Sequence, residues 1–322
     1  MVTSSLPVQV GVILATVAGL WIGARLLVDA VVRLARRVGL SELTVGLTIV
    51  AAGTSAPELV VTTDAALRGL GDIAVSNVVG SSIYNLAFIL GVLSLLRVVP
   101  IERGLVRRDG LALAVGTLLA AAAAIDLSVT RVEGLALAGL FVAYTSYLLR
   151  DAGGESSPSP GPAPGTTTRV IERTQFRGRH VAALLGGLAL VLVSGDLMVG
   201  AAVDLARGVG VSDWVIGGTI VAAGTSTPEF AVSLLAIRRG RLGVSVGNVV
   251  GSNLFNLLAI AGLSAALRPL TLSDAALTSI AWLVAVTGAM VAALWTGRRL
   301  SRPEGALFAA SEVVRWAFGL LR

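Results

Sequence analysis

The segment VAAGTSAPEL at residues 50–59 places a glycine, two hydroxyl side chains, a proline and a glutamate in an otherwise apolar stretch. The same pattern returns as VAAGTSTPEF at residues 221–230. Pro57 and Pro228 lack an N–H, and each proline ring clashes with the carbonyl four residues earlier. Each segment is therefore expected to form a kinked or broken helix. A single interruption could be an accident of packing, but two copies indicate a shared purpose.

The likeness between the two halves of the chain extends further, at a constant offset of 171 residues that relates Glu58 to Glu229. SNVVGSSIYN at residues 76–85 returns in VGNVVGSNLFN at residues 246–256. The matching polar positions are Asn77 and Asn248, Ser81 and Ser252, and Asn85 and Asn256. Ungapped identities at glycine, proline and polar positions predict an internal repeat.

The composition is typical of a protein that crosses a membrane many times. Of the 322 residues, 55% are hydrophobic and 14% are charged, whereas a soluble domain carries about 25% charged residues. The chain has no Cys, which excludes disulfides and thiolate metal sites, and its one His leaves too few ligands for a zinc site. We therefore expect an all-α polytopic membrane protein.

Apolar runs of roughly 20 residues, the length that crosses a bilayer, predict ten transmembrane helices. Their expected ranges are 7–32, 42–67, 72–96, 106–126, 131–149, 180–204, 213–237, 243–267, 274–296 and 304–320. The tract at residues 151–178 is rich in Gly, Pro, Ser and Thr, so we expect a flexible connector there. The expected domains are thus a first half at residues 1–150, the connector, and a second half at residues 179–322.

The positions of the basic residues predict the orientation. All 25 are Arg and they lie mostly between the spans, so the net charge of +6 gives no support for nucleic acid binding. Loops on one side, including the connector, hold 18 of them, and the other side holds 6. By the positive-inside rule the Arg-rich side is cytoplasmic, and both termini face outward. The remaining Arg25 lies four residues before Asp29 and is expected to pair with it.

Each half is expected to hold five spans, so the second half enters the membrane from the side opposite to the first. Many secondary transporters share such an inverted-topology repeat. Their substrate site lies near the midplane of the bilayer where the repeats meet, and matching segments interrupted by Gly or Pro point to it. The interrupted spans of this chain are 42–67 and 213–237.

The interrupted spans offer oxygen ligands of the kind that hard cations prefer. Carbonyls near Ala51–Gly53, which the proline should leave without helical partners, persist at membrane depth only where they are buried or line a polar cavity. Ca²⁺ takes about 6–8 oxygen ligands. The side chains beside these carbonyls and their repeats are Thr54, Thr225, Ser55, Ser226, Glu58 and Glu229.

Glu58 and Glu229 have no neighbouring Arg or Lys in the sequence. Because an ionised glutamate at the centre of a bilayer costs several kcal/mol, this pair needs cationic compensation or protonation. One Ca²⁺ would neutralise both carboxylates, and so would two Na⁺ or two protons. The alternative is that the two glutamates only hydrogen-bond across a packed bundle.

Three further matched pairs are less specific candidates. Ser81 and Ser252 serve close packing as readily as ion binding. Asn85 and Asn256 are costly to bury, which favours a role in lining the site. Asn77 and Asn248 could cap or bridge helices.

GTSAPE and GTSTPE, each followed by a segment of the GNVVGSNLFN type, resemble the two α-repeats of the Na⁺/Ca²⁺ exchangers in the cation/Ca²⁺ antiporter superfamily. The resemblance covers nearly the whole chain as a prokaryotic ten-helix exchanger. It implies a Ca²⁺ site surrounded by Glu58, Glu229, Thr54 and Thr225. It implies flanking Na⁺ sites completed by Ser55, Ser226, Ser81, Ser252 and the carbonyls of Ala51 and Ala222, with Asn85 and Asn256 bordering the central site.

The chain departs from some members of that family at Asn85 and Asn256, because they place an Asp at one of these positions. K⁺-dependent members are notably acidic there, so two asparagines weaken the case for K⁺ co-transport. The connector is also too short for the folded Ca²⁺-sensing domains of animal exchangers.

The resemblance and the paired carboxylates together predict an antiporter, not an enzyme, that exchanges Na⁺ for Ca²⁺ by alternating access. Ca²⁺ extrusion with three Na⁺ per Ca²⁺ is expected, in a chain that acts as a monomer in lipid without a resident cofactor. An H⁺/Ca²⁺ exchanger is the alternative, and a K⁺-dependent exchanger comes third. A channel needs no two inverted half-sites, and the spans hold no constellation of His with Asp or Glu for an enzyme.

Overall fold

The computed structural model describes residues 6–100, 105–154, 178–208, 222–297 and 299–320. Its first half consists of helices, π-helical segments (η) and two short strands. In chain order these are α1 Leu6–Val38, α2 Glu42–Val45, η1 Gly46–Val50, α3 Ala51–Thr54, α4 Ala56–Leu67, α5 Gly71–Ile83, η2 Tyr84–Ile89, α6 Leu90–Leu96, β1 Val99–Pro100, η3 Leu105–Gly110, α7 Leu111–Ala123, β2 Ser128–Val129 and α8 Arg131–Gly154.

The second half repeats this order wherever it is described, except that residues equivalent to η3 belong to the α-helix α15. Its elements are α9 Gly178–Gly208, α11 Ala222–Thr225, α12 Thr227–Arg238, α13 Leu242–Leu254, η5 Phe255–Ile260, α14 Ala261–Leu267, β3 Leu270–Thr271, α15 Ala275–Gly297, β4 Arg299–Leu300 and α16 Arg302–Leu320. From α3 to α6 and from α11 to α14, the bounds of matching elements differ by the offset found in the sequence. The internal repeat is thus a repeat of local structure.

The two halves are interleaved through close contacts. Strand β1 pairs antiparallel with β4, and β2 pairs with β3, so each pair joins the two halves. A Cβ atom built on Gly91 would lie 2.7 Å from the carbonyl oxygen of Gly305, and one on Gly134 would lie 2.6 Å from that of Gly262. These glycine pairs occupy matching positions of the repeat, and they let α6 pack on α16 and α8 on α14 at backbone distance.

The described residues contain six helices that are long and apolar enough to cross a membrane. A seventh candidate is the pair Glu42–Thr54 and Ala56–Leu67, which is bent by 50°. Residues expected in the spans 106–126 and 304–320 are also largely helical, while the span 213–237 is described only from residue 222 onward. The all-α polytopic membrane fold is confirmed, and the count of ten spans stays a prediction.

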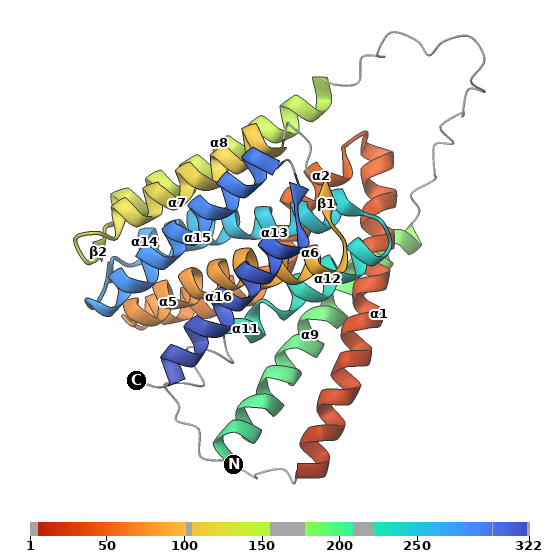
Figure 1. The fold of residues 1–322 in the computed structure, drawn as a ribbon, viewed down its shortest axis with the longest axis horizontal. Coiled ribbons are helices and arrows are strands. Elements are labelled where there is room, and N and C mark those ends of the chain that lie inside the picture. The colour runs from red at the N-terminus through yellow and green to blue at the C-terminus, as the bar shows by residue number, and fades with distance from the viewer. Residues whose placement is uncertain (1–5, 101–104, 155–177, 209–221, 298, 321–322) are drawn as a thin grey trace.

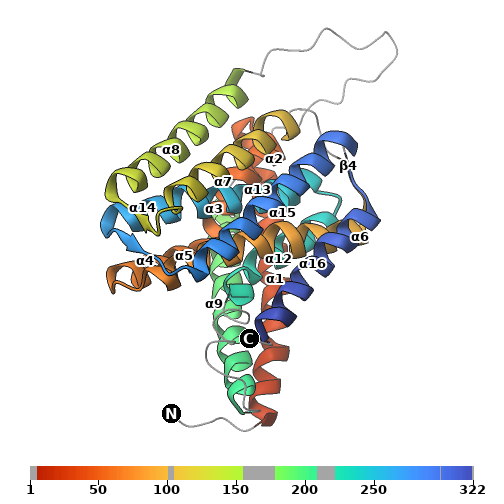
Figure 2. The same ribbon diagram turned by 60° about the vertical axis from the view of Figure 1, so that its left-hand side comes forward.

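Helices α1 and α9 lie side by side and extend beyond the other helices toward the bottom of both views (Figures 1 and 2). They share an apolar cluster that includes Ala24, Val191 and Val232 and is distinct from the larger core of the remaining helices. The expected ion pair between Arg25 and Asp29 is wrong. Asp29 pairs instead with Arg239, which follows α12, because α1 packs against α12 and brings this arginine close.

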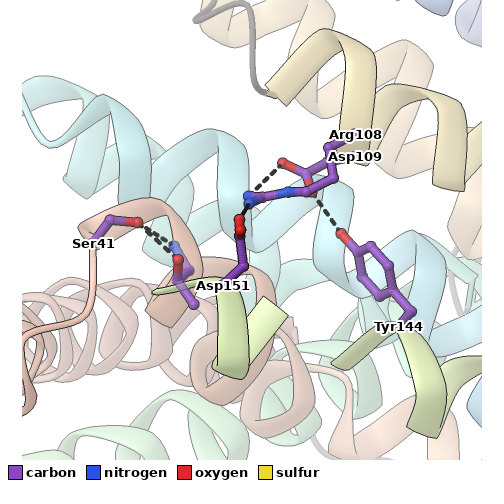
Figure 3. A network of polar contacts seen from close by, with 6 residues as sticks. Ser41, Arg108, Asp109, Tyr144 and Asp151 are labelled. Atoms are coloured by element: carbon purple, nitrogen blue, oxygen red, sulfur yellow. Dashed lines mark hydrogen bonds and ion pairs between the residues drawn. The ribbon is translucent and has the colours of Figure 1, made fainter. Parts of the chain in front are cut away.

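A polar network fastens the end of α8 to η3 (Figure 3). Arg108 donates to Asp109 through Nε (2.8 Å) and to Asp151 through Nη1 (2.8 Å), and the Tyr144 hydroxyl donates to the fully buried Asp109 (2.9 Å). Asp151 was expected to begin the connector, but α8 continues to Gly154. The rest of the expected connector up to residue 177 lies outside the described residues.

Candidate ion-binding site

Both proline-bearing segments break as predicted, at the serine two residues before the proline. Helix α3 ends at Thr54, and Ser55 leaves the helical conformation with φ −81° and ψ 15° before α4 begins. Ser226 has nearly the same conformation, φ −86° and ψ 6°, before α12. In each case the proline lies in the first turn of the new helix, where its missing N–H costs nothing.

One detail of this expectation is wrong. The carbonyl of Ala51 does not lose its helical partner, because it accepts the N–H of Ser55 at 3.0 Å. The reason is that a proline at position 57 removes the donor to Gly53, two residues further on, and leaves the preceding turn intact. Ala222, the equivalent residue, begins α11.

The carboxylates of the two halves are held in a crossed arrangement. Ser55 Oγ donates to Oε1 of Glu229 at 2.7 Å, and Ser226 Oγ donates to Oε1 of Glu58 at 3.0 Å. All four side chains are fully buried. Each break therefore supplies a hydroxyl to the glutamate of the other half, which brings the two interrupted helices together at one place.

The serines of α5 and α13 join the same cluster. Ser252 Oγ donates to Oε1 of Glu229 at 3.3 Å, and the hydroxyls of Ser81 and Thr225 are 3.3 Å apart. Both serines are fully buried. Their contacts with the broken segments favour a place in the site over the alternative of mere close packing.

The glutamates and two asparagines retain buried polar atoms without a hydrogen-bond partner. These atoms are Oε2 of Glu58 and of Glu229, and Oδ1 and Nδ2 of Asn85 and of Asn256. Nearly all buried polar groups in proteins are hydrogen-bonded, so unpartnered oxygens on these residues need an explanation. A bound cation would be the missing partner of the carboxylate and amide oxygens.

The π-helical segments η2 and η5 carry the two asparagines. Single π-helical turns inside α-helices occur frequently at functional sites, because the wider turn shifts the register of the side chains that follow. These segments could not be predicted from the sequence, since no residue type marks them.

The donor set is one of hard oxygen ligands with two carboxylates. In the described ranges no three His, Cys, Asp or Glu side chains gather as a metal-binding group. No Arg in this part of the chain forms an ion pair with Glu58 or Glu229, and the recorded ion pairs all lie elsewhere. The two glutamates thus remain without a protein counter-charge, as the sequence indicates, and the arrangement can hold cations with a total charge of about two.

Sequence reasoning left the role of Asn248 open and missed Glu312. Asn248 bridges the two broken helices behind the site, and Glu312 is a buried carboxylate on α16 that accepts from Arg315 at 2.6 Å. Arg315 is one of the 6 Arg assigned to the outer side, and its spacing of three from Glu312 in an apolar span is a signal for such a pair.

The family described as sodium/calcium exchanger protein matches residues 8–150 and 179–311 of this chain. The chain belongs to this family. MaX1 of Methanosarcina acetivorans, a sodium/calcium exchanger, is 29% identical over 88% of this chain and 90% of its own length. CaxA of Alkalimonas amylolytica is 36% identical over 85% of this chain and 86% of its own length.

Solved structures share the fold. Those of the sodium-calcium exchanger NCX_Mj, studied for extracellular ion exchange and induced binding-site occlusion, superpose with a TM-score of 0.81 at 27% identity. The match covers 97% of this chain and 99% of that one. The chain is therefore a multi-pass membrane protein of a family of cation/Ca²⁺ antiporters, not of a family of enzymes.

Proposed function

We propose that this sodium/calcium exchanger family member extrudes Ca²⁺ in exchange for entering Na⁺ by alternating access. The observation that carries the proposal is the pair of crossed, buried glutamates, Glu58 and Glu229, each with one carboxylate oxygen left unpartnered. The exchange named for MaX1 and NCX_Mj supports Na⁺ as the coupling ion.

The site residues are part of the proposal. Glu58 and Glu229, with the threonines beside the breaks, would hold Ca²⁺, and the serines and the backbone carbonyls would complete Na⁺ sites around it. The crossed serine bonds and the unpartnered amides support this set of residues. It comprises Glu58, Glu229, Thr54, Thr225, Ser55, Ser226, Ala51, Ala222, Ser81, Ser252, Asn85 and Asn256.

Charge determines the expected stoichiometry. Two carboxylates make the site neutral with one Ca²⁺ bound and leave it at +1 with three Na⁺ bound. Exchange of three Na⁺ for one Ca²⁺ would therefore move one net charge per cycle, worth about 2.3 kcal/mol per 100 mV of membrane potential. Ca²⁺ extrusion would be favoured by a negative cell interior.

The proposed orientation places the connector in the cytoplasm and both termini outside. In both views α1 begins and α16 ends toward the bottom, whereas α8 ends at the top, which supports opposite sides for the termini and the connector (Figures 1 and 2). Because the chain has no Cys, single cysteines placed at residues 156–166 can be labelled selectively. Labelling from outside intact cells would reverse the orientation.

The transport experiment uses purified protein in liposomes loaded with Na⁺. Uptake of radioactive Ca²⁺ is expected when Na⁺ is inside and absent outside. A K⁺/valinomycin clamp that makes the interior positive should raise the uptake rate, because each cycle would carry one net positive charge outward. Uptake driven by a pH gradient without Na⁺ would instead favour H⁺/Ca²⁺ exchange, the second candidate, which the two glutamates could also support. Uptake that needs K⁺ on the Ca²⁺ side would show K⁺ co-transport.

The protein is proposed to act as a monomer surrounded by lipid. Both halves of the site are supplied by one chain, which supports this assignment. Ca²⁺ flux that stays proportional to protein at limiting density in the liposomes would agree with it.

A further inference from the structure

Asn248 on α13 lies behind the candidate ion site, and its side-chain amide is fully engaged. Its Oδ1 accepts the hydroxyl of Thr54 at 3.0 Å. Its Nδ2 donates to the carbonyl oxygen of Glu229 at 3.3 Å and to Oγ of Ser233 at 3.0 Å. Both amide protons and the amide oxygen therefore bond to the protein, in contrast to the unpartnered amide of Asn256 in the following segment η5.

The bonds of Asn248 connect the two halves of the chain at the point where both helices break. Thr54 ends α3 in the first half, and Glu229 lies in the first turn of α12 in the second half. Thr54 Oγ1 also lies within hydrogen-bond distance of the carbonyls of Val50 (3.1 Å) and Ala51 (3.4 Å), so its one hydrogen has alternative acceptors in the protein beside Asn248. This leaves the lone pairs of the Thr54 oxygen available to a cation.

Ser233, which accepts a hydrogen bond from Asn248, is itself held in place. Ser233 Oγ donates to the carbonyl of Ser245 at 3.3 Å, and Ser245 Oγ donates to the carbonyl of Ser233 at 2.8 Å, which clamps α12 to α13. The first half contains an equivalent of the bond between Asn248 and Ser233. Asn77 donates to Thr62 Oγ1 at 2.9 Å, and these two residues occupy the positions of Asn248 and Ser233 in the repeat. The repeat thus keeps an asparagine–hydroxyl bond behind each break.

We infer that Asn248 is a positioning residue that sets the cation affinity of the site by holding Thr54 and Glu229 at a fixed separation. It does not bind the ion. The inference rests on the proposed function in taking Thr54 and Glu229 as ion ligands. A role in helix packing alone would lower stability without changing affinity, and this difference decides between the two.

The chain offers a matched control on the same helix. Asn253 is also fully buried, and its Nδ2 donates at 2.8 Å to the carbonyl of Val249 within α13. Asn253→Ala removes the same side-chain atoms as Asn248→Ala from a similarly buried place, including an Oδ1 that has no hydrogen-bond partner, but no bond to Thr54 or Glu229.

The experiment measures Ca²⁺ binding to purified full-length protein in detergent by isothermal titration, together with the melting temperature without Ca²⁺. Asn248→Ala is expected to weaken Ca²⁺ binding about tenfold, the size of one net buried hydrogen bond. Asn253→Ala is expected to lower the melting temperature as much but to leave the affinity within about twofold. Equal affinities of the two variants would overturn the inference.

A second variant covers the case in which Asn248→Ala does not fold. Ser233→Ala leaves Asn248, Thr54 and Glu229 in place and removes one anchor, so Ca²⁺ binding should weaken about threefold. Affinity unchanged in Ser233→Ala would then count against the inference. The proposed function has a separate test in the same titration, because wild-type Ca²⁺ affinity in Glu229→Gln would remove the ligand role itself.

Discussion

The surroundings of Asn85 in the first half and Asn256 in the second differ, although each asparagine follows an aromatic residue at the start of a π-helical segment. Tyr84 stacks on Phe88 with ring centroids 4.9 Å apart and on Trp316 at 5.9 Å. Phe255, the equivalent of Tyr84, meets Phe141 edge-on at 5.3 Å. The repeat therefore keeps an aromatic contact at this position, but the rings are stacked in the first half and edge-on in the second.

The largest difference between the two surroundings lies on the adjoining helices, α16 and α8. Glu312 on α16 occupies the position that Phe141 occupies on α8. Its side chain is 1% exposed and accepts from Arg315 Nε (2.7 Å), Arg315 Nη2 (2.6 Å) and Trp316 Nε1 (2.7 Å). A carboxylate that receives a bidentate guanidinium and an indole N–H has its charge compensated by the protein.

Comparison of Glu312 with Glu58 and Glu229 shows how a buried carboxylate with a protein counter-charge differs from the two proposed ion ligands. All three are buried in helices that belong to expected spans. Glu312 has a counter-charge and full hydrogen bonding, and its position is not repeated. Glu58 and Glu229 are repeated, receive only neutral hydroxyl donors, and keep one unpartnered oxygen each. Burial without a counter-charge, rather than burial alone, is therefore what supports the proposed ion site.

The largest expected effect comes from removing the uncompensated charges. Glu58→Gln and Glu229→Gln should each reduce Na⁺-driven Ca²⁺ uptake into liposomes at least about 100-fold, since each removes one partner of a buried charge interaction with Ca²⁺. Both variants should fold, because glutamine can still accept the serine hydroxyl. Uptake near the wild-type rate in either variant would show that the crossed pair is not the ion site.

The second prediction concerns the compensated charge. Glu312→Ala should destabilise the protein by about 2–3 kcal/mol, at the lower end for a broken buried pair because Arg315 is partly exposed. Ca²⁺ affinity should stay within about twofold, the reverse of the pattern expected for Glu58→Gln. Melting temperature and Ca²⁺ titration on the same preparation measure both quantities.

A double variant serves as the control for this prediction. Glu312→Gln with Arg315→Leu removes both charges and should recover part of the lost stability, because no unpaired charge remains. A strong loss of Ca²⁺ binding in Glu312→Ala with a normal melting temperature would place this carboxylate in the transport cycle and would end the distinction drawn above.

Much of this comparison could be predicted from the sequence, and the parts that could not have physical reasons. The breaks before Pro57 and Pro228 follow from local chemistry, and the repeat strengthens the signal, so the meeting of the two glutamates could be anticipated. The crossed serine bonds could not. The pair of Asp29 with Arg239 could not, because a partner 210 residues away is chosen by packing rather than by spacing. The same holds for the bridge that Asn248 makes to Thr54, which depends on how α13 meets α3.

The third prediction concerns a difference between the hydrogen bonds of the two half-sites. Glu229 accepts from Ser252 as well as from Ser55, whereas Ser81, the equivalent of Ser252, lies at hydrogen-bond distance from Thr225. Ser226→Ala should therefore weaken Ca²⁺ binding about tenfold, and Ser55→Ala only about threefold, because Ser252 continues to orient the Glu229 carboxylate.

The control for the serine pair is Ser55→Ala combined with Ser252→Ala. Once both serine donors to Glu229 are removed, the Ca²⁺ affinity of the double variant should fall to that of Ser226→Ala or lower. Equal effects of the two single variants would mean that Ser252 does not support Glu229 and that the half-sites are equivalent at this level.

The smallest effect is expected at the aromatic residues with which the comparison began. Tyr84→Phe gives the first half the residue that the second half has, and it keeps the ring that stacks on Phe88 and Trp316. Stability should change by no more than about 0.5 kcal/mol, the low end for a single hydroxyl, and Ca²⁺ affinity should not change. Phe255→Tyr makes the reverse exchange opposite Phe141, where no carboxylate stands, and should cost about 1 kcal/mol because a partly buried hydroxyl gains no charged neighbour. If melting temperatures show Tyr84→Phe to be the more damaging of the two, the Tyr84 hydroxyl is part of the Glu312 cluster and the aromatic layer is not interchangeable between the halves.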